Sequence, residues 1–173
     1  MDAVLIVLRF LHIVGGVLWA GSAIFYVLFV EPGVKALGPA GPKFMQELIQ
    51  ARKYPLFMNV VSILTVLAGG ALYWFSSGGM QWAWVRSGPG IGFTLGSLVA
   101  LAVWLIGFFY LRPRAERMGA LGREIAAAGG PPSTAQAAEL QTIGREMSSI
   151  GRVDAVLLLI SLALMATARY WNF

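Results

Sequence analysis

Four residues near the start of the chain have types and spacing that would suit a cofactor site on an apolar helix. Arg9, His12, Gly16 and Trp19 follow one another at steps of three or four residues, which places them on one face of a helix. His12 is the only histidine, and a neutral imidazole nitrogen is a known axial ligand of haem iron. Gly16, with Gly15 before it, would let a flat macrocycle approach the backbone. The Arg9 guanidinium would pair with a propionate.

A packing role for His12 remains open beside the haem hypothesis. A neutral histidine in a membrane span also forms hydrogen bonds to Ser or Thr on a neighbouring span, and such bonds contribute about 0.6 kcal/mol on average. Three possibilities are open at the second axial position of the iron: Met165, no ligand, or His12 of a second copy. Zinc or copper held by one histidine would lack ligands. His12 is thus the one expected metal-binding residue.

The composition places these residues in a membrane protein. The chain of 173 residues is 58% hydrophobic and 12% charged, with a mean hydropathy of +0.73, whereas a soluble domain carries about 25% charged residues. Its apolar runs are long enough to cross roughly 30 Å of hydrocarbon as helices. We expect one domain, 1–173, with four spans at about residues 3–30, 55–75, 92–111 and 153–171.

The sequence gives little support to other kinds of chemistry. Without cysteine, the chain can form no disulfide, thiolate metal site or cysteine nucleophile. It has no P-loop and no GxGxxG motif. We expect no carboxylate within the spans, which would leave a proton or cation relay without its usual ligands. The net charge of +5 indicates basic loops beside a membrane rather than a nucleic-acid surface.

The basic residues are distributed unevenly between the loops, and this indicates an orientation. The first and third loops together carry ten Lys and Arg residues, whereas the loop and chain end on the other side have Arg86 and Arg169. By the positive-inside rule, the first and third loops face the cytoplasm and both termini face outward.

Both expected cytoplasmic loops contain further helices. Glu31–Pro32–Gly33 should end the first helix, and residues 42–53 then favour a short amphipathic helix at the membrane interface. Ser133 followed by Gln136 is a capping-box pattern, so the third loop should form a helical hairpin. This hairpin is interpreted either as a solvated connector or as a docking surface for a partner.

Small residues predict where the helices approach each other closely. Gly92 and Gly96 form a small-xxx-small pattern in the third span, and residues 68–71 (AGGA) are small residues in the second. Such patterns lie at helix contacts in membranes. We favour contacts within the bundle over a dimer interface.

The first span resembles the opening helix of a superfamily of small bacterial four-helix membrane proteins. The residues that carry the resemblance are Leu11–His12, Trp19 seven residues further on, and Gly21. The superfamily includes the HemJ-type protoporphyrinogen oxidases, the copper-resistance D-type membrane domains and the DUF2269 proteins, and the chain is most similar to the DUF2269 branch. The resemblance implies a four-helix bundle in the bacterial cytoplasmic (inner) membrane. It also implies a b-type haem bound by His12.

The sequence therefore predicts an all-α integral membrane protein: a four-transmembrane-helix bundle with a cytoplasmic helical hairpin extension between helices 3 and 4. The leading functional hypothesis is that one b-type haem (haem b) binds through His12, with Arg9, Gly16 and Trp19 around it, for electron transfer or porphyrin-related redox chemistry. The alternative is a non-enzymatic scaffold or accessory subunit of a larger membrane complex. The expected partners are the lipid bilayer and either further copies of the chain or that complex, with no nucleic acid.

Overall fold

The computed structural model describes residues 2–172, and this part of the chain is helical without any strand. Met1 and Phe173, the end residues of the expected domain, lie outside the described residues. Four helices are long and apolar enough to cross a membrane: Ala3–Ala36, Tyr54–Ser76, Gly88–Ala128 and Thr134–Tyr170. Each corresponds to one expected span, so the expected all-helical architecture with four helices of spanning length is confirmed.

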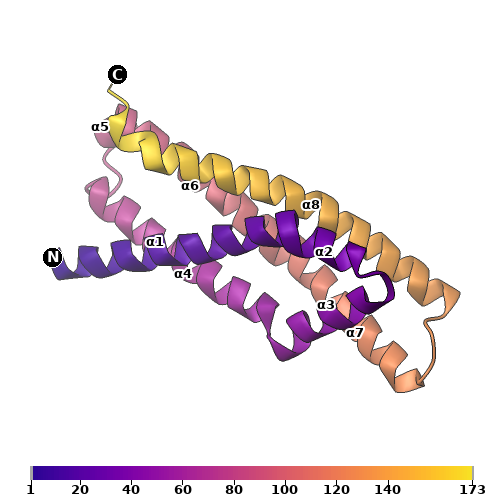
Figure 1. The fold of residues 1–173 in the computed structure, drawn as a ribbon. Coiled ribbons are helices and arrows are strands. Elements are labelled where there is room, and N and C mark those ends of the chain that lie inside the picture. The colour runs from indigo at the N-terminus through magenta and orange to yellow at the C-terminus, as the bar shows by residue number, and fades with distance from the viewer. Residues whose placement is uncertain (1, 173) are drawn as a thin grey trace.

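The four long helices form two antiparallel pairs. In the first pair α1 (Asp2–Phe25) crosses α4 (Tyr54–Ser76), and in the second α6 (Gly88–Ile106) runs along α8 (Thr134–Thr167). Both chain termini lie at one end of the molecule, which we call the termini end (Figure 1). The connections from the first to the second and from the third to the fourth long helix lie at the opposite end, which we call the hairpin end. α1 also packs on α8, and this contact joins the two pairs.

A small apolar core lies where the four long helices meet. It is formed by Trp19 and Ala20 of α1, Val61 of α4, Val103 of α6 and Leu158 of α8. Every one of the four long helices contributes at least one side chain, so they share this core.

Large apolar side chains also cover the outside of the long helices. Phe10 on α1 is 64% exposed, and Leu67 on α4 is 66% exposed. A soluble protein rarely presents so much contiguous apolar surface to water, whereas lipid tails solvate it without cost. The exposed faces therefore have the composition of lipid-facing surfaces.

The first and third long helices continue past their apolar segments through the same local structure. A π-helical turn at Tyr26–Val30 precedes Glu31–Pro32, and a second one at Gly107–Leu111 precedes Arg112–Pro113. In each case the backbone N–H of the charged residue, Glu31 or Arg112, donates a hydrogen bond to the backbone carbonyl oxygen of the first residue of the π turn. Proline has no N–H to donate and clashes with the carbonyl four residues back in a regular helix. The wider π turn accommodates it, and the helix goes on.

The expected end of the first helix at Glu31–Pro32–Gly33 is therefore wrong. The helix continues as α2 (Glu31–Ala36) and stops at Leu37. Gly38 follows with φ +51°, a left-handed conformation that glycine adopts without strain. The chain turns at this glycine, five residues later than the sequence indicates.

Short helical segments then lead to the second span. A 3₁₀ turn at Gly38–Ala40, α3 (Gly41–Gln46) and a π turn at Glu47–Ala51 follow in order. They cover most of the residues expected as one amphipathic helix. Lys53 at φ 52° then reverses the chain into α4.

The expected helical hairpin is confirmed. α6, the second π turn and α7 (Arg112–Ala128) form one continuous helix of 41 residues, roughly 60 Å long at 1.5 Å per residue. That is about twice the hydrocarbon thickness of a bilayer, so this helix is roughly double the length that a single span needs. Ser133 and Gln136 form the expected capping box at the start of α8.

Ion pairs join the two arms of this hairpin. Arg114 Nε lies 2.7 Å from a carboxylate oxygen of Glu146, and Arg117 Nε lies 2.7 Å from one of Glu139. The Arg117 guanidinium, which also approaches Glu124, lowers the pKa of the Glu139 carboxyl. These pairs fix α7 against the first half of α8 outside the apolar bundle.

Aromatic side chains pack together at the termini end. α5 (Trp82–Val85) is a single turn between α4 and α6. The Trp84 ring meets Tyr73 edge-on at 5.3 Å and stacks on Phe93 at 6.3 Å between centroids. Large amphipathic rings at one end of apolar helices are typical of a membrane–water boundary.

Candidate functional site

His12 lies in the contact between α1 and α4. Its Nδ1 is 2.9 Å from the backbone carbonyl oxygen of Thr65. A carbonyl oxygen only accepts, so Nδ1 carries the proton and donates it. This is a hydrogen bond to the neighbouring span, as expected for a packing histidine. The same bond also fixes the tautomer, because it leaves the lone pair on Nε2.

Two glycines allow the helices to approach closely enough for this bond. A Cβ atom at Gly69 would lie 2.7 Å from His12 Cε1, and a Cβ atom at Gly15 would lie 2.5 Å from Thr65 Oγ1. Both distances are too short for real side chains. The Thr65 hydroxyl donates to the Val61 carbonyl oxygen at 2.7 Å. The imidazole, the two glycines and Thr65 therefore form one interlocked contact.

The donor set of His12 fits an axial ligand to iron. The side chain is only partly buried, and its Nε2 has no hydrogen-bond partner in the part of the chain that the structure describes. A second-span carbonyl that holds Nδ1–H is a common arrangement behind a ligating histidine. The nitrogen that a metal would use is thus left free.

The other three expected site residues lie in different surroundings. Arg9 is exposed, one turn nearer the termini end. Gly16 faces α4, where a Cβ atom would lie 3.7 Å from Thr65 Cγ2. Trp19 is 7% exposed and belongs to the core. His12, Gly16 and Trp19 are therefore partly or fully buried on the side of α1 that packs in the bundle, whereas the Arg9 side chain is exposed.

Met165 and the glycines of the third span form contacts between α6 and α8. A Cβ atom at Gly96 would lie 2.8 Å from Met165 Cγ, and one at Gly92 would lie 2.8 Å from Ala168 Cβ. Ser161 Oγ donates to the Gly96 carbonyl oxygen at 2.9 Å. The small-xxx-small pattern thus lies at a contact within the bundle, as favoured above.

One buried carboxyl group in α8 is not among the site residues that the sequence predicts. Asp154, the second residue of the expected fourth span, is 6% exposed. Its Oδ1 is inaccessible to solvent and has no hydrogen-bond partner. The expectation of no carboxylate within the spans is therefore wrong. α8 runs from Thr134 to Thr167, so Asp154 lies near the middle of this helix rather than at its solvent-exposed start.

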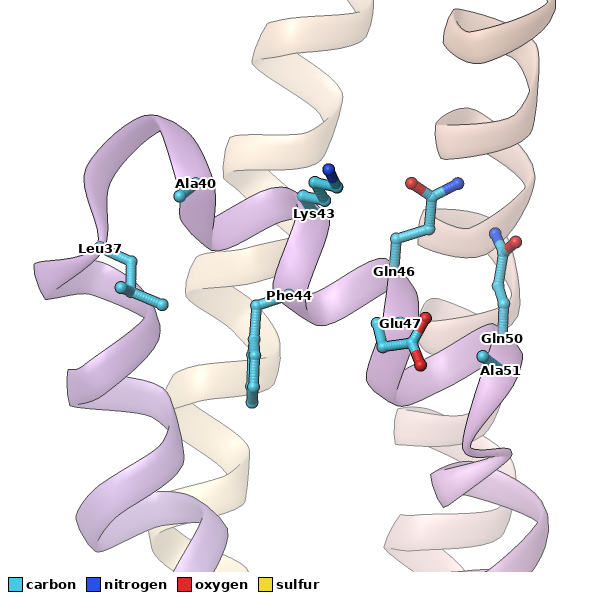
Figure 2. A pocket seen from close by; sticks show the side chains of 8 residues that line it. All are labelled: Leu37, Ala40, Lys43, Phe44, Gln46, Glu47, Gln50 and Ala51. Atoms are coloured by element: carbon cyan, nitrogen blue, oxygen red, sulfur yellow. The ribbon is translucent and has the colours of Figure 1, made fainter.

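Two surface hollows lie at the hairpin end, away from the four expected site residues. One, of about 570 Å³, is lined by the connector between the first and second spans. Figure 2 shows its side chains, which come from one stretch of chain: Leu37, Ala40, Lys43, Phe44, Gln46, Glu47, Gln50 and Ala51. The other, of about 520 Å³, lies between this connector and α7. Within residues 2–172, no three His, Asp, Glu or Cys side chains gather as they would around a metal ion.

Comparisons with protein-family models, with curated proteins and with solved structures find no match to this chain. The geometry of His12 and its surroundings is therefore the basis for assigning a function.

Proposed function

We propose that this protein is a membrane protein that binds one b-type haem through Nε2 of His12 and serves electron transfer. The observation that supports this most is the bond from His12 Nδ1 to the Thr65 carbonyl oxygen, which orients the ring and leaves the Nε2 lone pair free. A bound haem would supply one-electron redox chemistry. The chain would supply the ligand, His12 Nε2, and the hydrogen bond that orients it.

The other expected residues have separate roles in this proposal. The exposed guanidinium of Arg9, one turn from His12, suits a haem propionate through charge-assisted hydrogen bonds. Gly16 positions the ligand indirectly, because it admits α4 against α1. Trp19 fills the core next to that contact.

The proposed orientation follows from the charges at the hairpin end. The ten basic residues of the first and third loops lie there, opposite Arg86 and Arg169. By the positive-inside rule the hairpin end is cytoplasmic and both termini face outward, in the bacterial cytoplasmic membrane. A reporter that is active only in the cytoplasm should be inactive when fused to the C-terminus, and activity there would reverse the orientation.

A second candidate function is an accessory subunit or scaffold of a larger membrane complex. The observation that favours it is the hairpin of α7 and α8, whose arms extend beyond the bundle and carry ion-paired Arg and Glu side chains. In that case His12 serves only to hold α1 on α4. The haem spectrum distinguishes this candidate from the first.

Substitution of His12 tests the ligand directly. His12→Ala in detergent-purified protein should remove the haem absorption, and added imidazole should restore it by filling the vacated position. Met165→Leu is the matched control: it conserves volume, and Met165 packs on Gly96, so the spectrum should stay unchanged. An unaltered spectrum in His12→Ala would move the ligand elsewhere, and loss of the spectrum in Met165→Leu would make that thioether a ligand.

A further inference from the structure

Asp154 has an environment that a charged carboxylate does not tolerate. Within residues 2–172, its Oδ1 is the only buried side-chain oxygen or nitrogen that lacks a hydrogen-bond partner. An ionised carboxylate there would lose the hydration of Oδ1 without a hydrogen bond in return, and such desolvation costs several kcal/mol in real proteins. A neutral carboxyl group avoids most of this cost.

The groups next to Asp154 along α8 face the core of the bundle. Gly151, one turn before it, lies against the π turn at Tyr26–Val30, since a Cβ atom there would be 3.8 Å from Val27 Cγ2. Leu158, one turn after it, is a core residue that packs with Val103 of α6. Asp154 is on the same face as these two residues, so its carboxyl lies among apolar groups of three helices.

The charged and titratable groups nearest to Asp154 are engaged with one another at the hairpin end. Glu31 accepts from Ser148 and from Lys35, and Arg152 donates to Ser148. Ser148 is six residues before Asp154, roughly 9 Å along the helix. On the neighbouring elements the other such groups are Tyr26, which contacts Met45, and Arg114, which pairs with Glu146 and covers the Tyr110 ring. None of them forms a hydrogen bond or ion pair with Asp154.

Two π-helical turns flank α8 on the hairpin side of Asp154. The turns at Tyr26–Val30 and Gly107–Leu111 both pack against α8, and the contact between Val27 and Gly151 lies about one helical turn from the carboxyl. π turns in otherwise regular helices frequently mark functional sites. Each turn interrupts the regular α-helical hydrogen bonds of a helix that packs on α8, at a level between the buried carboxyl and the polar hairpin end.

We propose that Asp154 is a proton-binding site inside the bundle, which holds a proton while the helices are closed and exchanges it with water at the hairpin end past the two π turns. On loading, a hydronium ion transfers a proton to a carboxylate oxygen, an O–H bond forms, and water is released. Release is the reverse step, with water as the acceptor. The exchange involves no redox partner and does not depend on haem at His12.

Selective labelling tests this site without a substitution at Asp154. The chain contains two aspartates, Asp2 and Asp154. In an Asp2→Asn chain grown with aspartate labelled with ¹³C at the side-chain carboxyl and reconstituted in bilayers, every labelled carboxyl belongs to Asp154. At neutral pH its infrared absorption should be the C=O stretch of a protonated acid, one group per chain. The band should shift after transfer to D₂O and convert to carboxylate absorption at alkaline pH.

Two outcomes would overturn the proposal. If the labelled carboxyl absorbs entirely as carboxylate at neutral pH, Asp154 holds no proton. If the band of the protonated acid stays unshifted after long exposure to D₂O, the proton does not exchange with water. A parallel comparison uses unlabelled variants. Asp154→Asn should delete one protonated-carboxyl band, whereas Glu139→Gln should delete none, because Arg117 holds the pKa of the Glu139 carboxyl low. Equal spectra for both variants would also contradict the assignment.

Discussion

His12 Nδ1 donates a hydrogen bond to the Thr65 carbonyl oxygen over 2.9 Å, and this bond links the first and second spans. It crosses a contact in which Gly69 and Gly15 leave room for the ring and for the Thr65 side chain. The bond has two consequences: it stabilises the α1–α4 pair, and it presents Nε2 as the free ring nitrogen. Changes to the glycines therefore affect both stability and the proposed ligand.

Gly69→Ala should destabilise the protein. The new Cβ would lie 2.7 Å from His12 Cε1 and 2.8 Å from Nδ1, so the imidazole must move and its bond to Thr65 weakens. Overpacking of this kind costs about 1–3 kcal/mol in the free energy of unfolding. Gly70→Ala is the control, because nothing lies within 4 Å of its Cβ position. Thermal denaturation in detergent should show a lower midpoint for Gly69→Ala alone, and equal midpoints would refute the interlocked contact.

Gly92→Ala should loosen the second helix pair. Its Cβ would lie 2.8 Å from Ala168 Cβ and 3.0 Å from Ala168 Cα, and Ala168 is fully buried. Backbone atoms cannot rotate aside, so α6 and α8 must separate, at a cost of about 1–3 kcal/mol. The measurement is hydrogen exchange of the α6 and α8 amides. Gly122→Ala, in an open position of α7, should leave the exchange unchanged; similar protection in both variants would contradict the contact.

The hairpin should loosen in acid. Because Arg117 lowers the pKa of Glu139 in the folded state, the pair stabilises the hairpin above the ordinary range of a glutamate. This stabilisation is lost as the pH falls through the lowered pKa. Both groups are exposed, so the effect on overall stability is small. The protection factors of the amides in residues 117–139, which are exchange rates corrected for the intrinsic effect of pH, should fall in acid.

Two variants, each of which removes one positive charge, test whether the Arg117–Glu139 pair causes this pH dependence. Arg117→Gln should abolish most of the acid-induced loss of protection, since it removes the bidentate partner of Glu139. Arg145→Gln removes an exposed charge from the same hairpin and should leave the acid-induced loss of protection intact. If both variants respond to acid as the wild type does, the Arg117–Glu139 pair has no part in it.

The sequence predicts the second span closely, and the reason is local. Residues 55–75 were expected and α4 runs from Tyr54 to Ser76, because an apolar run bounded by a proline and a serine–glycine turn determines both ends. The capping box of Ser133 and Gln136 is likewise a local signal and is present. Features of this kind depend only on neighbouring residues.

Features that depend on packing or on backbone register cannot be predicted from the sequence alone. Pro32 is a helix breaker by residue type, but the π turn before it shifts the hydrogen bonds and lets the helix continue. Asp154 lies at the edge of the hydropathy peak, and only the packing of α1 and α6 on α8 buries it. The partner of His12 is equally hidden, since Thr65 meets it only through the crossing of α1 and α4.

The two helix pairs of the bundle share a backbone arrangement that is not evident from their sequences. Each half is an antiparallel pair whose first helix leaves through a π turn followed by a charged residue and a proline: Glu31–Pro32 in one half, Arg112–Pro113 in the other. The spans themselves show no common motif. The similarity lies in backbone geometry, and the two turns meet α8 on the hairpin side of Asp154.

The absorption spectrum of the wild-type protein tests the haem proposal most directly. The chain should be expressed with an adequate haem supply, purified in detergent and measured in the oxidised state and after reduction. If His12 binds haem, the spectrum should contain a Soret band that shifts on reduction, with one haem per chain. A protein without a Soret band in either state would contradict it.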